Sequence, residues 1–288
     1  MTWRLRVSHR TGLTYAGPVA SSFNEARMSP SDEPRQRVVE SRVSVWPAAQ
    51  TFTYRDYWDT QVTAFDIHVP HVSLEVVAEA TVETSANGSG ATAGGGAGGG
   101  LDWASLVEPR LTDRMHEMLL ATPRTALDEE LTGVAEELRG PRATPAAAAG
   151  AVFALVADTI AYVPGSTGVQ TDAVQVWRQR EGVCQDISHL SLGLLRTMGV
   201  PARYVSGYLH PKADAELGVG VEGQSHAWIE WFDGEWHGFD PTNAVPVGER
   251  HVVVGRGREY GDVPPLKGVY AGPAGTGQDV SVTVTRLR

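Results

Sequence analysis

The chain has 288 residues, 42% of them hydrophobic and 20% charged, and its 34 Asp and Glu against 24 Lys and Arg give a net charge of −10. This composition is typical of a globular protein with one large or two ordinary domains, and its negative charge disfavours nucleic acid and anionic membranes as partners. A single cysteine excludes an internal disulfide, and the charged first residues lack the apolar core of an export signal. We therefore expect a cytoplasmic protein.

Residues 1–85 show apolar and polar residues in alternation, most clearly in WRLRVSHRTGLTY and SRVSVWPAAQTFTYRDYWDTQVTAFDIHV. Such alternation indicates half-buried strands, so we predict a small all-β domain over 1–85. The next segment, 86–100, is rich in glycine and has no side chains that could form a core. Its composition indicates a flexible linker or insert.

Residues 101–288 carry helical patterns first and strand patterns afterwards. One helix is expected to begin at Pro145 with Thr144 as its N-cap. Another begins at Cys184, where apolar residues recur at intervals of three and four, and ends before Gly199. Helices followed by consecutive strands are typical of an α+β domain with an antiparallel sheet, which we predict over 101–288.

Cys184, the only cysteine, stands at the start of its predicted helix, two residues after Gly182. The free N–H groups and the dipole of a helix N-terminus stabilise a thiolate. The same N–H groups could receive the oxyanion of a tetrahedral intermediate, and Gly182 would let a substrate backbone approach closely. By its position alone, Cys184 fits a small buried hydrophobic residue equally well.

A thiol nucleophile needs a base, and the base needs a group that orients it. His226 opens one predicted strand and Asp240 ends the next, with a turn signal between them. A three-residue loop over 232–234 would place His226 directly opposite Asp240, with Gly234 at positive φ. We therefore predict a hydrogen bond between His226 and Asp240, to which the tertiary fold has to bring Cys184.

The segments GVCQDISHL, LRTMGVPARYVSGYL, SHAWIEWF and WHGFDPTN resemble, in this order, the transglutaminase-like core of papain-type thiol enzymes. The resemblance runs from about residue 162 to residue 243, and residues 1–85 are similar to the β domain that precedes this core in bacterial members. It implies Cys184 as nucleophile, His226 as general base and acid, and Asp240 as the orienting group. It also implies a thioester formed from a carboxamide, followed by transfer to an amine or to water.

Other side chains near these motifs are weaker candidates. Tyr162 or Gln185 could donate a second hydrogen bond to the oxyanion. Gly182, Trp177 and Trp228 could line the substrate site, although the two tryptophans fit core packing of a small sheet as well.

The histidines show no spacing typical of a zinc site and no calcium-binding loop is present in the sequence, so we expect no metal and no organic cofactor. The predicted function is a thiol acyltransferase or amidohydrolase. Its substrates would be protein, peptide or small-molecule amides, with an amine as one acceptor. The alternatives are a cysteine peptidase or amidase that uses water, and a binding module without activity. The three intact residue types argue against the binding module.

Overall fold

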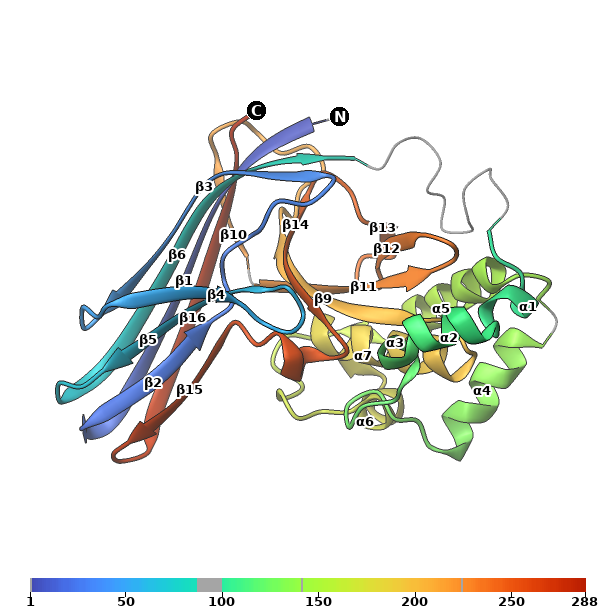
Figure 1. Cartoon of the computed structure of the whole chain (residues 1–288), viewed down its shortest axis with the longest axis horizontal. Coiled ribbons are helices and arrows are strands. Elements are labelled where there is room, and N and C mark those ends of the chain that lie inside the picture. The colour runs from blue at the N-terminus through green and yellow to red at the C-terminus, as the bar shows by residue number, and fades with distance from the viewer. Residues whose placement is uncertain (1, 87–99, 141, 224) are drawn as a thin grey trace.

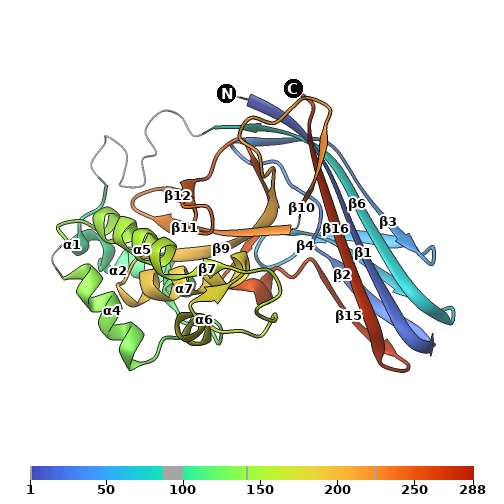
Figure 2. The ribbon, with the colours of Figure 1, turned by 180° about the vertical axis from the view of Figure 1, so that it is seen from behind.

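A computed structural model describes residues 2–86, 100–140, 142–223 and 225–288. Two antiparallel β-sheets lie at one end of the molecule, and helices packed on a third sheet lie at the other (Figures 1 and 2). The predicted glycine-rich linker falls, apart from residues 86 and 100, outside the described residues.

The first two sheets contain every strand of the first 85 residues. These strands are β1 (Thr2–Val19), β2 (Ser21–Ala26), β3 (Gln36–Trp46), β4 (Thr51–Arg55), β5 (Gln61–Ile67) and β6 (His71–Ser85). The cause of the alternation in the sequence is visible in β1, where Trp3, Leu5 and Val7 are buried while Thr2 and Arg6 are exposed. Successive side chains of a strand point to opposite faces, and only one face of this sheet is covered.

Three further strands, from the second half of the chain, complete these sheets: β10 (Gly220–Gly223), β15 (Leu266–Ala271) and β16 (Gly275–Arg286). The strand orders are β10-β16-β1-β6-β3 and β15-β2-β5-β4. This pairing differs from the predicted grouping of all residues 101–288 in one separate domain. Alternation identifies a strand but not its partner, because the backbone groups that pair strands are common to all residues.

The helices lie between residues 103 and 197, with one 3-10 turn further along. They are α1 (Trp103–Leu106), α2 (Pro109–Arg114), α3 (His116–Leu119), α4 (Glu129–Arg139), α5 (Pro145–Thr159), α6 (Ala173–Gln179), α7 (Cys184–Thr197) and η1 (Tyr260–Asp262). Two predicted helix boundaries are confirmed. The Thr144 hydroxyl accepts from the Ala147 N–H at the start of α5, and α7 begins at Cys184, with Gly199 at φ +86° after its end. Among the described residues, no helix has both the length and the hydropathy needed to cross a membrane.

The third sheet carries the helices and has the strand order β13-β12-β11-β9-β14. Its strands are β9 (Ala202–Leu209), β11 (Ser225–Phe232), β12 (Trp236–Asp240), β13 (Val245–Pro246) and β14 (His251–Gly257), and a short parallel pair is formed by β7 (Ala161–Tyr162) and β8 (Glu181–Gly182). All pairings within the third sheet are antiparallel. The predicted α+β fold class is therefore confirmed.

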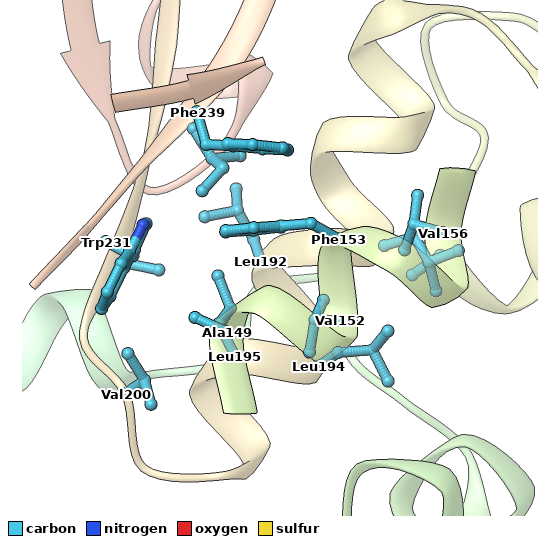
Figure 3. Packing of buried hydrophobic residues seen from close by; sticks show 14 of the residues in the cluster. Ala149, Val152, Phe153, Val156, Leu192, Leu194, Leu195, Val200, Trp231 and Phe239 are labelled. Atoms are coloured by element: carbon cyan, nitrogen blue, oxygen red, sulfur yellow. The ribbon is translucent and has the colours of Figure 1, made fainter. Parts of the chain in front are cut away.

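An apolar core fixes α7 against this sheet (Figure 3). Phe153 of α5 stacks on Phe239 of β12 with 4.0 Å between ring centroids, and Leu192 and Leu195 of α7 are fully buried in the same cluster, as is nearly all of Trp231. Burying a side chain of this size contributes about 1.5–3 kcal/mol. The first turn of α7 is thereby held next to β11 and β12.

The two halves of the molecule also share a core. Trp3 and Leu5 of β1 form one apolar cluster with Tyr208 of β9 and Val252 of β14. Next to it, the Gln36 side chain donates to the Val253 carbonyl and accepts from its N–H, both at 2.8 Å. The first sheet therefore packs against β9 and β14, and this contact sets its position relative to the elements that carry Cys184 and His226.

Candidate active site

Strands β11 and β12 bring His226 and Asp240 into contact. His226 Nε2 lies 2.7 Å from Asp240 Oδ2, and both side chains are largely withdrawn from solvent. The predicted hydrogen bond between them is therefore confirmed. Since Nε2 is used for Asp240, the other ring nitrogen, Nδ1, remains for a partner on the opposite side of the imidazole.

The register of the hairpin differs from the prediction. Phe232 pairs with Trp236, so the three-residue loop begins one residue later than expected and is centred on Gly234, which has φ +89°. The positive φ at Gly234 is confirmed. His226 lies two positions away from the point directly opposite Asp240. A shift of two residues keeps a side chain on the same face of the sheet, and therefore the contact survives.

Asp240 is completely buried and accepts five hydrogen bonds. Its Oδ2 accepts from His226, from Asn243 Nδ2 at 2.7 Å and from His251 Nε2 at 3.3 Å, while Oδ1 accepts from the backbone N–H groups of Thr242 and Asn243 at 3.0 and 3.2 Å. Burial alone would raise the pKa of Asp240, but these hydrogen bonds and the two imidazoles hold it below its usual range. The carboxylate is thus charged and fixed in orientation.

His251 is a partner that the sequence did not reveal. It lies on β14, eleven residues after Asp240, and is almost fully buried. The Gly248 N–H donates to His251 Nδ1 at 3.2 Å, which places the proton of the neutral ring on Nε2, facing Asp240. Burial lowers the pKa of His251 although Asp240 opposes this. His251 is therefore a neutral donor to the carboxylate.

The environment of His226 favours its charged form. Burial alone would lower its pKa, but the hydrogen bond to Asp240 and the neighbouring Cys184 outweigh burial and raise the pKa of His226 to about 10. An imidazolium at this position is thus stabilised by the Asp240 carboxylate, which lies on its Nε2 side, and by the neighbouring Cys184. This is the arrangement that a proton-donating partner of a thiolate requires.

Cys184 is half-buried and is the first residue of α7. Asp186 and Ile187 donate their N–H groups to the Val183 carbonyl at 2.9 and 3.0 Å, so the N–H groups of Cys184 and Gln185 precede the first helical hydrogen bonds. These two N–H groups can receive negative charge that develops beside the sulfur.

Cys184 and His226 open into one cavity of about 230 Å³. Its far wall comes from the first sheet, namely His9 and Thr11 of β1 and Gln278 and Val280 of β16. His226 also lines a second cavity, of about 380 Å³. His226 therefore lines two cavities, and the first sheet forms part of the first cavity.

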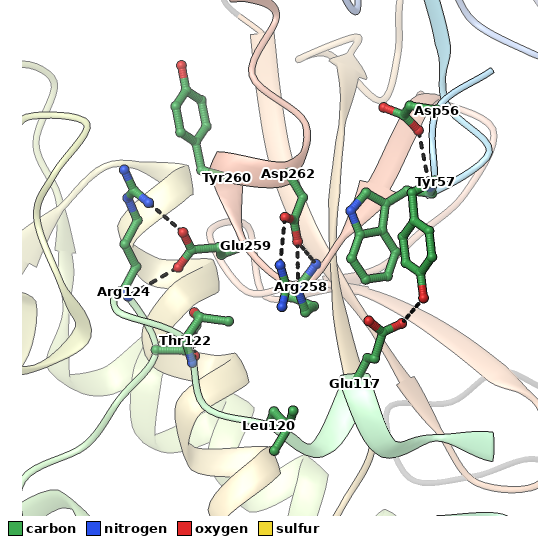
Figure 4. Close-up of polar contacts among 12 residues, drawn as sticks. Asp56, Tyr57, Glu117, Leu120, Thr122, Arg124, Arg258, Glu259, Tyr260 and Asp262 are labelled. Carbon is green, nitrogen blue, oxygen red and sulfur yellow. Dashed lines mark hydrogen bonds and ion pairs between the residues drawn. The ribbon is translucent and has the colours of Figure 1, made fainter. Parts of the chain in front are cut away.

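Another wall of the cavity is Tyr260, which η1 holds in place (Figure 4). The Arg124 guanidinium pairs with Glu259 at 2.5 Å, and the Tyr260 N–H donates to His189 Nε2 at 3.2 Å. Burial lowers the pKa of His189 to about 3, so this ring is neutral and accepts from Tyr260. His189 therefore supports η1 and, through it, the position of Tyr260.

Three of the weaker candidates lie close to Cys184. Gln185 lines the first cavity, and Tyr162 lines the second. Tyr162 pairs with Gly182 in the short parallel ladder, and burial together with the nearby Cys184 raises the pKa of Tyr162. Tyr162 and Gln185 are therefore both placed near Cys184, while Gly182 lies two residues before it in the chain.

The two tryptophan candidates require correction. Trp177 packs in the core of the helical part, and its indole N–H donates to Glu130 at 2.7 Å. Trp228 is fully buried, with its ring 6.1 Å from that of His226 and edge-on to His251 at 5.2 Å. Neither side chain is among the described residues that line the two cavities next to His226. Their burial makes them packing partners and not substrate contacts.

The same cluster contains possible metal ligands. One ligand atom each from His226, Asp240 and His251 lies within 4.8 Å of the others, and we call these three residues the His–Asp–His cluster. Imidazole binds a metal only through an unprotonated nitrogen, so an ion here would replace the protons that point at Asp240. Metal binding would thus take the Nε2 position of His226 and break its contact with Asp240.

Comparisons with known proteins identify the family of this chain. Residues 5–83 match the bacterial transglutaminase-like N-terminal region, and residues 132–241 match the transglutaminase-like superfamily. The chain is 42% identical over 285 residues to an uncharacterized protein of Mycobacterium leprae, with 99% of both chains covered. It is 35% identical over 300 residues to an uncharacterized protein of Mycobacterium tuberculosis, covering 98% of this chain and 93% of that one. A crystal structure of a candidate cysteine protease from Cytophaga hutchinsonii shares the fold, with a TM-score of 0.72 and 18% identity over 99% of this chain and 100% of that chain.

Proposed function

Because this chain belongs to the transglutaminase-like superfamily, we propose that it is a thiol enzyme that cleaves carboxamide bonds through an acyl-enzyme on Cys184. One observation carries the proposal. Cys184 at the N-terminus of α7 opens into the same cavity as His226, whose Nε2 is held 2.7 Å from the buried Asp240. Substrates of the glutamine or peptide amide type fit this chemistry.

In the proposed reaction Cys184 acts as the nucleophile and His226 as the acid–base group. The Cys184 thiolate attacks the carbonyl carbon, a C–S bond forms, and the oxyanion is received by the N–H groups of Cys184 and Gln185. His226 donates its Nδ1 proton to the leaving nitrogen, the C–N bond breaks, and ammonia or an amine departs. An incoming amine or water then gives a proton to His226 and breaks the C–S bond. Asp240 keeps the ring oriented and stabilises its charge.

The proposed acyl donors are proteins, peptides or small-molecule amides, and the proposed acceptors are amines or water. We also propose the reducing cytoplasm as the place of action. The mechanism needs its single cysteine as a free thiol, and a reducing compartment preserves that thiol.

The test is intact-mass analysis of the products from a mixture of glutamine-containing peptides, incubated with and without a primary amine. Incorporation of the amine would identify a transferase, and a product formed with water alone would identify an amidase or peptidase. Cys184→Ala should abolish either product, because no thioester can form without the sulfur.

A second measurement separates an enzyme from a binding module. Iodoacetamide should alkylate Cys184 at pH 6 much faster than it alkylates the same cysteine in the unfolded chain. If the two rates are equal and no product forms from the amides, Cys184 is an inert residue of the fold and the proposal is wrong.

A further inference from the structure

The edge of the first sheet is only partly occupied. Strand β16 pairs with β1 along its whole described length up to a bulge near Gly275, but β10 pairs with β16 only from Val282 to Thr285 (Figure 2). Among the described residues, no strand pairs with the outer edge of β16 between residues 276 and 281. An unpaired strand edge offers a row of N–H and C=O groups to another extended chain.

The direction of these backbone groups follows from the hydrogen bonds at the end of β16. The Leu287 N–H donates to Arg4 of β1, whereas the Arg286 carbonyl accepts from Gly218 on the other side. Backbone groups alternate between the two sides of a strand, and the register with β1 is regular as far as Gly277. The N–H and C=O groups of Val280 and Gln278 therefore point to the unpaired edge and take no part in pairing with β1.

This free edge begins where the chain turns toward the proposed catalytic base. Strand β10 ends at Gly223, opposite Val282, and β11 begins at Ser225 with His226 as its second residue. An added strand that continues the line of β10 along β16 would therefore pass directly beside His226. Gln278 and Val280, whose backbone groups have no partner among the described residues, line the cavity that holds Cys184.

The wall of the cavity on this side carries no charge. The Tyr208 hydroxyl donates to the Met28 carbonyl, so it accepts from His9 Nδ1 at 3.1 Å, and His9 is neutral because burial lowers its pKa to about 4. Thr11, Gln278 and Val280 are also uncharged. A neutral wall beside a free strand edge suits a polypeptide backbone better than a charged small molecule.

We propose that an extended polypeptide segment of the substrate binds as an additional strand on the edge of β16, beside Val280 and Gln278, and thereby lies across Cys184. The proposal rests on the proposed function and specifies its substrate class as polypeptide instead of small free amides. The β region would then have a role in catalysis, because it supplies the hydrogen bonds that align the scissile amide. Alternate side chains of the bound segment would point into the cavity.

The experiment measures how well peptides protect Cys184 from iodoacetamide at pH 6. The probe is a mixture of capped ten-residue peptides of random sequence, and a mixture of single amino-acid amides serves as its control. We expect the peptides to slow alkylation of the unaltered protein at least about fivefold, and the single amides to have little effect. Protection by the amides equal to that by the peptides, or no protection by peptides, would overturn the proposal.

Two variants test the backbone contact. Val280→Pro removes the N–H at the free edge without removing a bond to β1, and edge strands tolerate proline. Val280→Ala changes the side chain but keeps the N–H. For each variant the rate with peptides is divided by its own rate without them. We expect the protection to be lost in Val280→Pro and kept in Val280→Ala, and equal protection in both would refute strand addition.

A third measurement needs no variant. Peptides methylated on every backbone nitrogen should lose their protection of the unaltered protein, because neither edge of such a peptide can donate to β16. Unchanged protection by methylated peptides would again argue against the proposal. Failure of the proposed function has a different signature, namely alkylation without peptides that is as slow as in the unfolded chain.

Discussion

Replacing Asp240 with Asn tests whether the Asp240 carboxylate stabilises the charged form of His226. Oδ1 of Asp240 accepts from two backbone N–H groups, so the amide oxygen of the variant has to stay on that side. Its NH₂ group then takes the place of Oδ2 and meets the donors of Asn243 and His251. To accept from this NH₂, His226 Nε2 has to lose its proton. The ring would then carry its proton on Nδ1 only and could no longer be an imidazolium held by a carboxylate.

The size of the effect follows from the pKa of His226. The rise from an ordinary value of 6.5 to about 10 corresponds to at most ~5 kcal/mol, because one pKa unit is worth ~1.4 kcal/mol. Cys184 supplies part of that rise, and breaking a buried ion pair typically costs ~3–5 kcal/mol. We therefore expect Asp240→Asn to lower the free energy of unfolding by about 3 kcal/mol at pH 6, and turnover by at least about 10²-fold.

The pH dependence has a definite sign. The pKa of His226 is raised by folding, so its contribution to stability is complete below about 6.5 and is lost as the pH rises through about 10. The pKa of Asp240 is lowered by folding, so its contribution is present above the ordinary range of a carboxyl and is lost in acid. The difference between the two proteins should be largest between about pH 4 and pH 6.5 and should shrink toward pH 10.

The assay combines urea unfolding from pH 5 to pH 10 with the rate of Cys184 alkylation at pH 6. Glu230→Gln is a matched control, since Glu230 is also a buried carboxylate but pairs with Arg203 and Arg256, away from His226. The control should lose stability and keep the alkylation rate. If Asp240→Asn unfolds and reacts with the same pH profile as the unaltered protein, the assignment of Asp240 to His226 would be refuted.

Four other predictions concern His251, two buried histidines, two glycines and the binding of zinc. His251→Phe removes one donor to the carboxylate and leaves a backbone N–H unpaired, so urea unfolding should show a loss of ~1–3 kcal/mol, with a smaller loss of turnover than in Asp240→Asn. His9 and His189 are buried with pKa values of about 4 and 3, so stability present above pH 6.5 should fall by roughly 2 kcal/mol for each at pH 5, and equal unfolding free energies at pH 7 and pH 5 would contradict this. A Cβ on Gly207 would lie 2.0 Å from a carbonyl of β14, so Gly207→Ala should destabilise by ~1–3 kcal/mol, whereas Gly133→Ala, with open space in a helix, should stabilise by up to ~1 kcal/mol in the same titration. Added Zn²⁺ should inhibit turnover by binding the His–Asp–His cluster, and chelation with EDTA should reverse the inhibition; full activity in saturating Zn²⁺ would disprove it.

Features that depend on a few neighbouring residues could be read from the sequence. Thr144 and Pro145 define the start of α5, because a hydroxyl cap and a ring without an N–H both suit the first helical turn. The start of α7 at Cys184 and the positive φ of Gly234 also depend on neighbouring residues and could be predicted in the same way. His226 and Asp240 lie on the same face of the sheet because side chains alternate between the two faces with a period of two residues. Moving the three-residue loop by one position changes the pairing register by two residues, so the two side chains stay on one face.

Only the tertiary structure decided which distant residues meet. The Leu101 N–H donates to Asp233 in the hairpin loop, a contact across 132 positions that no local signal contains. His251 reaches Asp240 because β14 pairs with β9 and not because of any spacing between the two residues.

The far wall of the cavity that holds Cys184 could not be predicted from the sequence either. His9 and Val280 line it because β16 returns to pair with β1, more than 250 residues apart in sequence. Strands pair through backbone groups that every residue carries. A cavity is the space left between elements whose positions are fixed by packing elsewhere. Neither leaves a pattern in the order of side chains along the chain.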